Sequence, residues 1–203
     1  MALNVMGSKT ILVLPASCSS VICGPYPQVS VKVPVLHTAF ETAGAAAAGV
    51  TAALEIQGKR DIGVLAWAGD GGTFDIGLQA LSGAAERNDD FIYICYDNEA
   101  YMNTGIQRSS ATPYMAWTTT TPETHPKEQR KKNIAEIMAA HQIPYIATAN
   151  IAYPEDYAMK LEKAKKFRGL RFIHLLAPCP TGWKIPSEHS IRVARMATRS
   201  RVF

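Results

Sequence analysis

The chain has 203 residues, a formal net charge of +4 and a hydrophobic content of 47%. This length suits one well-buried α/β domain, which we expect to span residues 1–203, and so small a charge excess does not indicate a nucleic-acid-binding protein. No apolar stretch is long enough to cross a membrane, and Ile11–Leu14 is too short for a signal peptide, so we expect a soluble, cytoplasmic protein.

Strand-like apolar runs alternate with helical patterns along nearly the whole chain. The expected strands are Thr10–Leu14, Ile62–Ala68, Phe91–Tyr96, Tyr145–Thr148 and Phe172–Ala177, and the expected helices are Phe40–Glu55, Thr73–Arg87, Lys127–His141, Pro154–Phe167 and Ser187–Thr198, with a long loop from Glu99 to about Pro126. Such alternation is typical of an α/β fold with a mostly parallel sheet and helices on both faces.

Both ends of the chain look abrupt. Met1–Gly7 reads as the end of an amphipathic helix whose beginning is missing, and Ser200–Phe203 stops without a cap or a polar tail. We therefore expect a chain that is shortened at both ends.

The helix expected at Phe40–Glu55 has little side-chain bulk around Gly44 and Gly49, with alanines between them. Another part of the structure must therefore approach it closely. A tightly packed core helix is the first interpretation, and helix contact at a subunit interface is the second.

Basic residues gather late in the chain. They are Lys160, Lys163, Lys165, Lys166 and Arg168, and then Arg192, Arg195, Arg199 and Arg201. Solvated helix faces are the favoured interpretation, and a docking surface for an anion or a partner is the alternative.

Polar groups follow two of the expected strands at the point where each strand ends. Gly69-Asp70-Gly71 closes the first of them, and Asn98 follows the Phe91–Tyr96 strand. Because parallel strands end at one edge of a sheet, these groups are expected to lie close together. A carboxylate, a carboxamide and a backbone carbonyl suit Mg²⁺, and the helix N-terminus after Gly71 suits an anion, so the pattern predicts a metal-diphosphate site.

Taken alone, the Gly-Asp-Gly motif is weak evidence for such a site, because an aspartate in a tight turn usually serves to stabilise the turn itself. Together with Asn98 and the glycine-bounded loop after it, the motif resembles the signature of the thiamine diphosphate-binding fold. More closely, the chain resembles the β subunit of the pyruvate:ferredoxin (2-oxoacid:ferredoxin) oxidoreductase family. The matching residues, spread over nearly the whole chain, are Cys18–Ser20, His37–Glu41, Gly69–Ile76, Asp97–Gly105, Ala111–Pro113, Ile151–Asp156 and Ala177–Trp183.

This resemblance implies a set of cofactor contacts. Asp70, the Asn98 side chain and the Ala100 carbonyl would hold Mg²⁺ on the diphosphate, with Gly69 and Gly71 in the adjoining turn. Asn103 would lie beside the thiazolium, where its amide could hydrogen-bond the substrate carbonyl or the oxyanion that develops there. The alternative for Asn103 is a loop asparagine in a left-handed turn.

The chain has four cysteines. The resemblance implies that Cys18 and Cys179 are ligands of a [4Fe–4S] cluster near the thiamine. Such a cluster takes four thiolates, and the Cys-x-x-Cys pair that supplies the other two in the family is absent here. Cys95 is expected as a buried core residue and Cys23 lies off the matching position, so we expect an incomplete ligand set.

His37 and Glu41 remain open at this stage. His37 is assigned to the cofactor site, with an ordinary hydrogen bond inside the fold as an equal alternative. Glu41 reads as a carboxylate at a helix start or a polar contact near the cofactor, because the family carries its activating glutamate on another subunit. The other histidines, His125, His141, His174 and His189, lack the spacing of metal ligands.

The resemblance implies a catalytic subunit that oxidatively decarboxylates a 2-oxo acid, with pyruvate as the first choice. It also implies an α subunit that completes the thiamine site, γ and δ subunits, and coenzyme A and ferredoxin as acceptors. One alternative is the same chemistry on 2-oxoisovalerate, an aryl 2-oxo acid or oxalate. Another is an inactive assembly remnant. The weakest alternative is a fragment of a thiamine-dependent decarboxylase or acetolactate-synthase-like enzyme without iron–sulfur chemistry. Cys18 and the Cys179–Trp183 loop argue against it.

Overall fold

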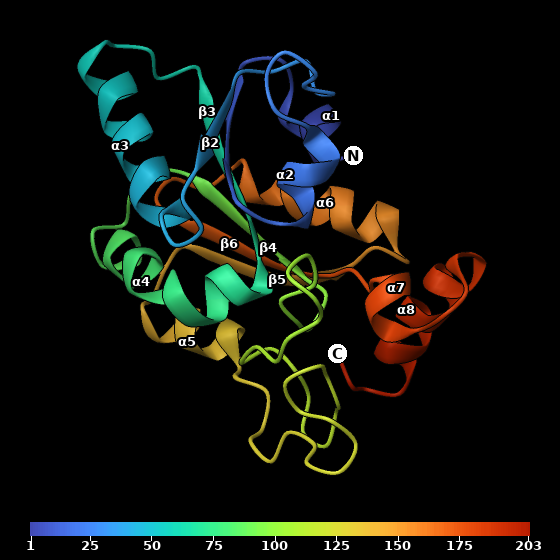
Figure 1. The fold of residues 1–203 in the computed structure, drawn as a ribbon. Helices are drawn as coiled ribbons and strands as arrows, with labels where there is room; N and C mark the ends of the chain where they lie inside the picture. Colours follow the sequence, from blue (N-terminus) through green and yellow to red (C-terminus); the bar gives the residue numbers. More distant parts are fainter.

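The computed structural model describes residues 1–203. Its centre is a six-stranded sheet with the strand order β2-β1-β3-β4-β6-β5, in which every neighbouring pair is parallel. The predicted α/β fold with a parallel sheet is therefore confirmed. Helices cover both faces of this sheet (Figure 1).

The strands are β1 (Thr10–Pro15), β2 (Val35–Thr38), β3 (Gly63–Gly69), β4 (Ile92–Asp97), β5 (Tyr145–Asn150) and β6 (Arg171–Leu176). The α-helices are α1 (Ala2–Met6), α2 (Cys18–Cys23), α3 (Ala43–Ile56), α4 (Leu78–Glu86), α5 (Ile134–Ala140), α6 (Pro154–Ala164), α7 (Pro180–Trp183) and α8 (Ser190–Arg199). A π-helical turn, η1, covers Gly72–Ile76, and a 3₁₀ turn, η2, covers Ser187–His189. None of these helices is both long and apolar enough to cross a membrane.

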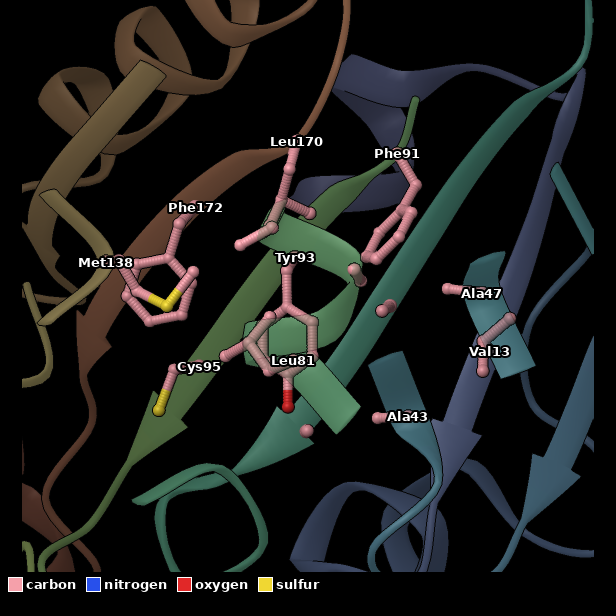
Figure 2. Close-up of a cluster of buried hydrophobic side chains, with 14 of the residues drawn as sticks. Val13, Ala43, Ala47, Leu81, Phe91, Tyr93, Cys95, Met138, Leu170 and Phe172 are labelled. Carbon is pink, nitrogen blue, oxygen red and sulfur yellow. The ribbon is translucent and has the colours of Figure 1, made fainter. Parts of the chain in front are cut away.

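Alternate residues of the strands feed two separate hydrophobic cores. Val64, Ala66 and Ala68 of β3 pack toward α3, α4 and α5, whereas Leu65 and Trp67 face α1 and α6. This is the pleat of a strand that is buried on both sides. Figure 2 shows the first core, in which the β4 side chains Tyr93 and Cys95 lie beside Phe172 and Leu81.

Three short elements, β2, α2 and α7, were not predicted. The edge strand β2 is partly exposed and lacks a long apolar run, which hides it from a pattern search. The helix α2 begins at a capping box, in which the Ser17 hydroxyl accepts from the Ser20 backbone and the Ser20 hydroxyl accepts from Ser17. That Ser-x-x-Ser spacing was the available signal.

The predicted helix Lys127–His141 is wrong in its first half, because α5 begins only at Ile134. The segment before it is held by tertiary contacts, since the Lys127 and Lys132 backbone N–H groups donate to the Ala116 and Ser110 carbonyls. The Asn133 side chain then accepts from the Glu136 N–H and caps the true start of the helix.

The small-residue helix is a packed core helix at its first turn. A Cβ on Gly44 would lie 2.9 Å from the Leu81 backbone nitrogen and 3.0 Å from the Ala80 carbonyl carbon of α4. Gly49 faces open space, with nothing within 4 Å of an added Cβ. The close approach that the sequence required is therefore made by α4 at Gly44.

Candidate functional site

The carboxyl ends of β1, β3 and β4 surround a cavity of about 420 Å³. Its lining comes from three segments: Ala16–Cys18 with Ser20 and Val21, the Gly69–Gly71 turn with Phe40 and Tyr96, and the loop residues Asn98 and Ala100–Thr104. The site thus lies where parallel α/β sheets usually bind their ligands.

Oxygen atoms of Asp70, Asn98 and Ala100 converge at the floor of this cavity. The Asn98 amide oxygen occupies a position 3.1 Å from Asp70 Oδ1 and 2.9 Å from the Ala100 carbonyl oxygen. The amide nitrogen, on the other side, lies 3.5 Å from Cys18 Sγ. The hydrogen bonds of the protein alone favour the reverse orientation, in which the amide nitrogen donates to both oxygens, whereas a bound cation would need the amide oxygen at this position.

Such a cluster of oxygens matches the needs of a small divalent cation. An octahedral Mg²⁺ holds its ligands at 2.0–2.1 Å, which separates adjacent ligand oxygens by about 2.9 Å. The separations of 2.9 and 3.1 Å around the Asn98 oxygen agree with that spacing. The donor set of a carboxylate, a carboxamide and a carbonyl therefore fits Mg²⁺.

Asp70 is fully enclosed, with 1% of its surface exposed. It accepts hydrogen bonds from Ser109 Oγ at 2.9 Å and from the Asn98 N–H at 3.3 Å. Burial raises the pKa of Asp70 well above its ordinary value, and the nearby Asp97 carboxylate raises it further. A cation at this position would compensate the negative charge that the protein alone leaves poorly neutralised.

A buried ion-pair network involves the two residues that flank Asn98. Lys131 Nζ lies 2.7 Å from Asp97 Oδ2 and 2.8 Å from Glu99 Oε1, and His174 Nε2 lies 2.7 Å from the same Asp97 oxygen. Burial alone would raise the pKa of Asp97, but Lys131 and His174 outweigh it and lower the pKa. Sequence reasoning missed Lys131, because the helix expected over its segment hid its inward direction.

The Gly69–Gly71 turn leads from β3 directly into η1. Gly71 lies against the ring of Tyr101, where an added Cβ would overlap the ring carbons. The Tyr101 hydroxyl donates to Asp75 Oδ2 at 2.7 Å, and Asp75 also accepts from the Ser110 N–H at 3.1 Å. Glycine is thus needed here for close approach of the turn to the loop that carries Ala100 and Asn103.

Asn103 is exposed and lines the cavity. It is not one of the residues with a positive φ, which in this loop are Glu99, Gly105 and Ile106. The left-handed turn considered as an alternative for Asn103 is therefore not observed. The Asn103 backbone lies close enough to the Cys18 thiol to lower its pKa, although burial of Cys18 raises that pKa more strongly.

Cys18 and Cys179 lie at the same end of the sheet. Cys18 is the first residue of α2, Cys179 caps α7, and both raise the pKa of Tyr96, after burial, to about 12. The other cysteines lie elsewhere: Cys95 is buried in β4, and Cys23 is buried in the core on the opposite face of the sheet. No group of at least three His, Cys, Asp or Glu residues forms a further metal site.

Comparisons with known proteins agree with this geometry. The family described as "Thiamine pyrophosphate enzyme, C-terminal TPP binding domain" matches residues 17–175. The chain is 56% identical to the ketoisovalerate oxidoreductase subunit VorB of Pyrococcus furiosus, over 99% of this chain and 67% of VorB. It is 52% identical to the pyruvate synthase subunit PorB of Methanothermobacter thermautotrophicus, over 98% of this chain and 70% of PorB.

The chain belongs to the thiamine diphosphate-binding β subunits of the 2-oxoacid:ferredoxin oxidoreductase family. A solved 2-oxoglutarate:ferredoxin oxidoreductase from Magnetococcus marinus shares the fold, with a TM-score of 0.76 and 24% identity over 96% of this chain and 70% of that chain. This β-subunit chain spans about two thirds of the two relatives, VorB and PorB.

Two predicted site residues of this β subunit, His37 and Cys179, are not part of the cavity lining, and neither is Glu41, whose role the sequence left open. His37 is exposed on the edge strand β2, opposite Leu14 of β1, and is not part of the cavity lining. Glu41 is exposed just before α3. A cofactor role for His37 stays a prediction.

Proposed function

We propose that this β subunit binds thiamine diphosphate through Mg²⁺ in the cavity at the carboxyl ends of β3 and β4. The observation that carries the proposal is the convergence of the Asp70, Asn98 and Ala100 oxygens at Mg²⁺ spacing. The Gly69–Gly71 turn and the start of η1 would present backbone N–H groups to the diphosphate. We further propose that the chain takes part in oxidative decarboxylation of a 2-oxo acid.

When bound, thiamine diphosphate would supply a thiazolium ring that accepts the electron pair which decarboxylation leaves on the former carbonyl carbon of the 2-oxo acid. The protein must orient the substrate and neutralise charge on the carbonyl oxygen. Asn103 is proposed for that task, because its carboxamide lines the cavity and can donate a hydrogen bond to this oxygen. Tyr101 and Met102 would form apolar walls beside it.

An iron–sulfur cluster fits these residues only in part. Cys18 and Cys179 provide two thiolates at one end of the sheet, whereas a [4Fe–4S] cluster takes four. Cys23 and Cys95 are buried in separate cores and cannot complete the set without unfolding. A complete cluster at this end of the sheet would require ligands from outside these residues.

Calorimetry tests the cofactor proposal. Thiamine diphosphate is titrated into the chain with and without Mg²⁺, and then with Ca²⁺ in place of Mg²⁺. We expect binding that depends on the divalent ion, since the metal joins the diphosphate to Asp70 and Asn98. Absence of binding, also after addition of the proposed α subunit, would favour the inactive assembly remnant.

The substrate is proposed to be pyruvate, with 2-oxoisovalerate as the second candidate. The similarity to PorB supports the first and the similarity to VorB supports the second. The test is kcat/KM for both acids, measured with the complex reconstituted from the proposed α, γ and δ subunits, coenzyme A and ferredoxin. A preference for the branched acid would overturn the first choice without affecting the cofactor proposal.

A further inference from the structure

Lys131 occupies an unusual position in the β subunit. It comes from the irregular segment before α5, and its ammonium group bridges the carboxylates of Asp97 and Glu99, the two residues that flank Asn98. Its side chain is 21% exposed, while those of Asp97 and Glu99 are 0% and 11% exposed. The bridge is therefore mostly shielded from solvent, and its geometry is fixed on both sides of a proposed metal ligand.

The turn that Lys131 bridges needs external support. Glu99 has a φ of 70°, a left-handed conformation that is unfavourable for a residue with a side chain. The Glu99 N–H donates to Asp97 Oδ1 at 2.9 Å, which closes the turn tightly. This conformation sends the Asn98 side chain and the Ala100 carbonyl toward the same point, so its retention decides whether their oxygens meet.

Two further contacts hold the same backbone but do not use charge. The Thr112 hydroxyl donates to the Glu99 carbonyl at 2.6 Å, and Trp183 Nε1 donates to the Asn98 carbonyl at 2.9 Å. Both fix carbonyl groups, whereas neither reaches the Asp97 and Glu99 side chains. Lys131 is thus the contact that ties the two flanking side chains together.

We propose that Lys131 is a positioning residue for the cation site, holding the Asp97–Glu99 turn so that Asn98 and Ala100 present their oxygens to the metal. The inference rests on the proposed function, because it concerns the affinity for Mg²⁺ and thiamine diphosphate. Residues that orient metal ligands without touching the metal typically change metal affinity about 10- to 100-fold when they are removed.

Electrostatics alone predicts the opposite sign. Lys131 carries a positive charge close to the proposed cation, so its removal would lower the repulsion and leave Asp97 and Glu99 to attract Mg²⁺. A long-range charge effect would therefore tighten Mg²⁺ binding in a Lys131→Met variant. If Lys131 positions the turn, the same variant should bind Mg²⁺ more weakly. The direction of the change in Mg²⁺ affinity therefore distinguishes a positioning role from a charge effect.

The test is calorimetric titration of Mg²⁺ into the full chain at a fixed concentration of thiamine diphosphate. Wild type is compared with Lys131→Met, Lys131→Arg and the control Lys160→Met, which removes an equal charge from an ion pair with Asp156 on the partly exposed face of α6. We expect about 10-fold or greater loss of affinity for Lys131→Met, substantial rescue by Lys131→Arg, and no change for Lys160→Met. Circular dichroism and thermal unfolding of each metal-free variant report folding separately.

If Lys131→Met does not fold, Lys131→Gln takes its place, since it removes the positive charge and its amide can still donate one hydrogen bond to a flanking carboxylate. A severalfold loss of Mg²⁺ affinity in a folded Lys131→Gln variant supports the proposal, because loss of the charge alone would tighten binding. If wild type binds Mg²⁺ and the folded variant binds it equally well or more tightly, the positioning role of Lys131 is wrong. No binding by wild type overturns the proposed function, and this inference with it.

Discussion

Two ion-pair networks join the same two strands, β4 and β6, at opposite ends. At the amino end, Asp90 pairs with Arg171 and, at 2.9 Å, with Arg168. At the carboxyl end, Asp97 pairs with Lys131 and His174, both at 2.7 Å. The register places Ile92 opposite Arg171 and Cys95 opposite His174, so the networks are a few residues apart along one strand pair.

The difference lies in what surrounds each network. Asp90 also accepts from the Gly169 N–H at 3.2 Å, and its acceptors are well matched to donors. The carboxyl-end network instead borders Asp70, Asn98 and Ala100, where one end of the Asn98 carboxamide lies 3.1 Å from Asp70 Oδ1 and 2.9 Å from the Ala100 carbonyl oxygen. At the amino end the carboxylate oxygens of Asp90 are satisfied within the chain, although Arg171 Nε is buried without a partner. The carboxyl end leaves an excess of oxygen atoms, which is the feature that a bound cation would use.

The largest expected effect follows from removing the charge at the oxygen cluster. Asp70→Asn should lower the affinity for Mg²⁺ and thiamine diphosphate by about 100-fold or more, because a direct ligand contributes more than the groups that orient it. The metal-free protein should be at least as stable as wild type, since a buried carboxylate next to Asp97 is neutralised. Calorimetry and urea unfolding measure the two quantities.

Breaking the amino-end network should have the reverse profile. Arg171→Met leaves Asp90 without its more buried partner, and we expect the free energy of unfolding to fall by about 2 to 3 kcal/mol. Cofactor affinity should stay at the wild-type value, because the pair lies at the far end of β4 and β6. An Arg171→Met variant with the unfolding free energy of wild type but without cofactor binding would contradict the proposed difference between the two ends of the strand pair.

The amino-end network should also affect how the free energy of unfolding changes at acidic pH. Burial alone would raise the pKa of Asp90, but Arg168 and Arg171 outweigh it and lower the pKa. A carboxylate with a lowered folded-state pKa stabilises the protein above its unfolded value of about 3.9, and that contribution is lost as the pH falls through the lower folded value. The stability difference between wild type and Asp90→Asn should therefore shrink below about pH 4. Urea unfolding from pH 6 to pH 3 measures it.

The smallest effect concerns Lys127, which is 1% exposed and donates to the Thr112 and Ser110 carbonyls behind the site loop. Burial lowers the pKa of Lys127 to about 8, and the Arg108 charge adds to the effect. Because the unfolded lysine keeps its proton to about pH 10.4, the unfolded state binds more protons between these values. The unfolding free energy of wild type should thus rise with pH from about 8 to 10, relative to Lys127→Met. If the unfolding free energies of the two proteins change equally with pH, folding does not lower the pKa of Lys127.

Local patterns carried the strand and helix predictions where a segment is buried on a regular period. β3, β4 and β6 are buried, mostly apolar runs, and each lies within a residue or two of its expected bounds. The exceptions are segments whose side chains are used in long-range contacts. Lys127–Lys132 has a helical composition but remains irregular, because its lysines reach inward to carbonyls and carboxylates of the site loop.

By itself, the sequence determined the parallel α/β order and the two strand ends that carry Asp70 and Asn98, because periodic burial and motif spacing are local properties. Only the tertiary structure decided that Lys131 bridges Asp97 and Glu99 beside Asn98, and that His37 lies outside the cavity. These depend on a left-handed residue at Glu99 and on contacts between segments distant in the chain, which no local pattern records.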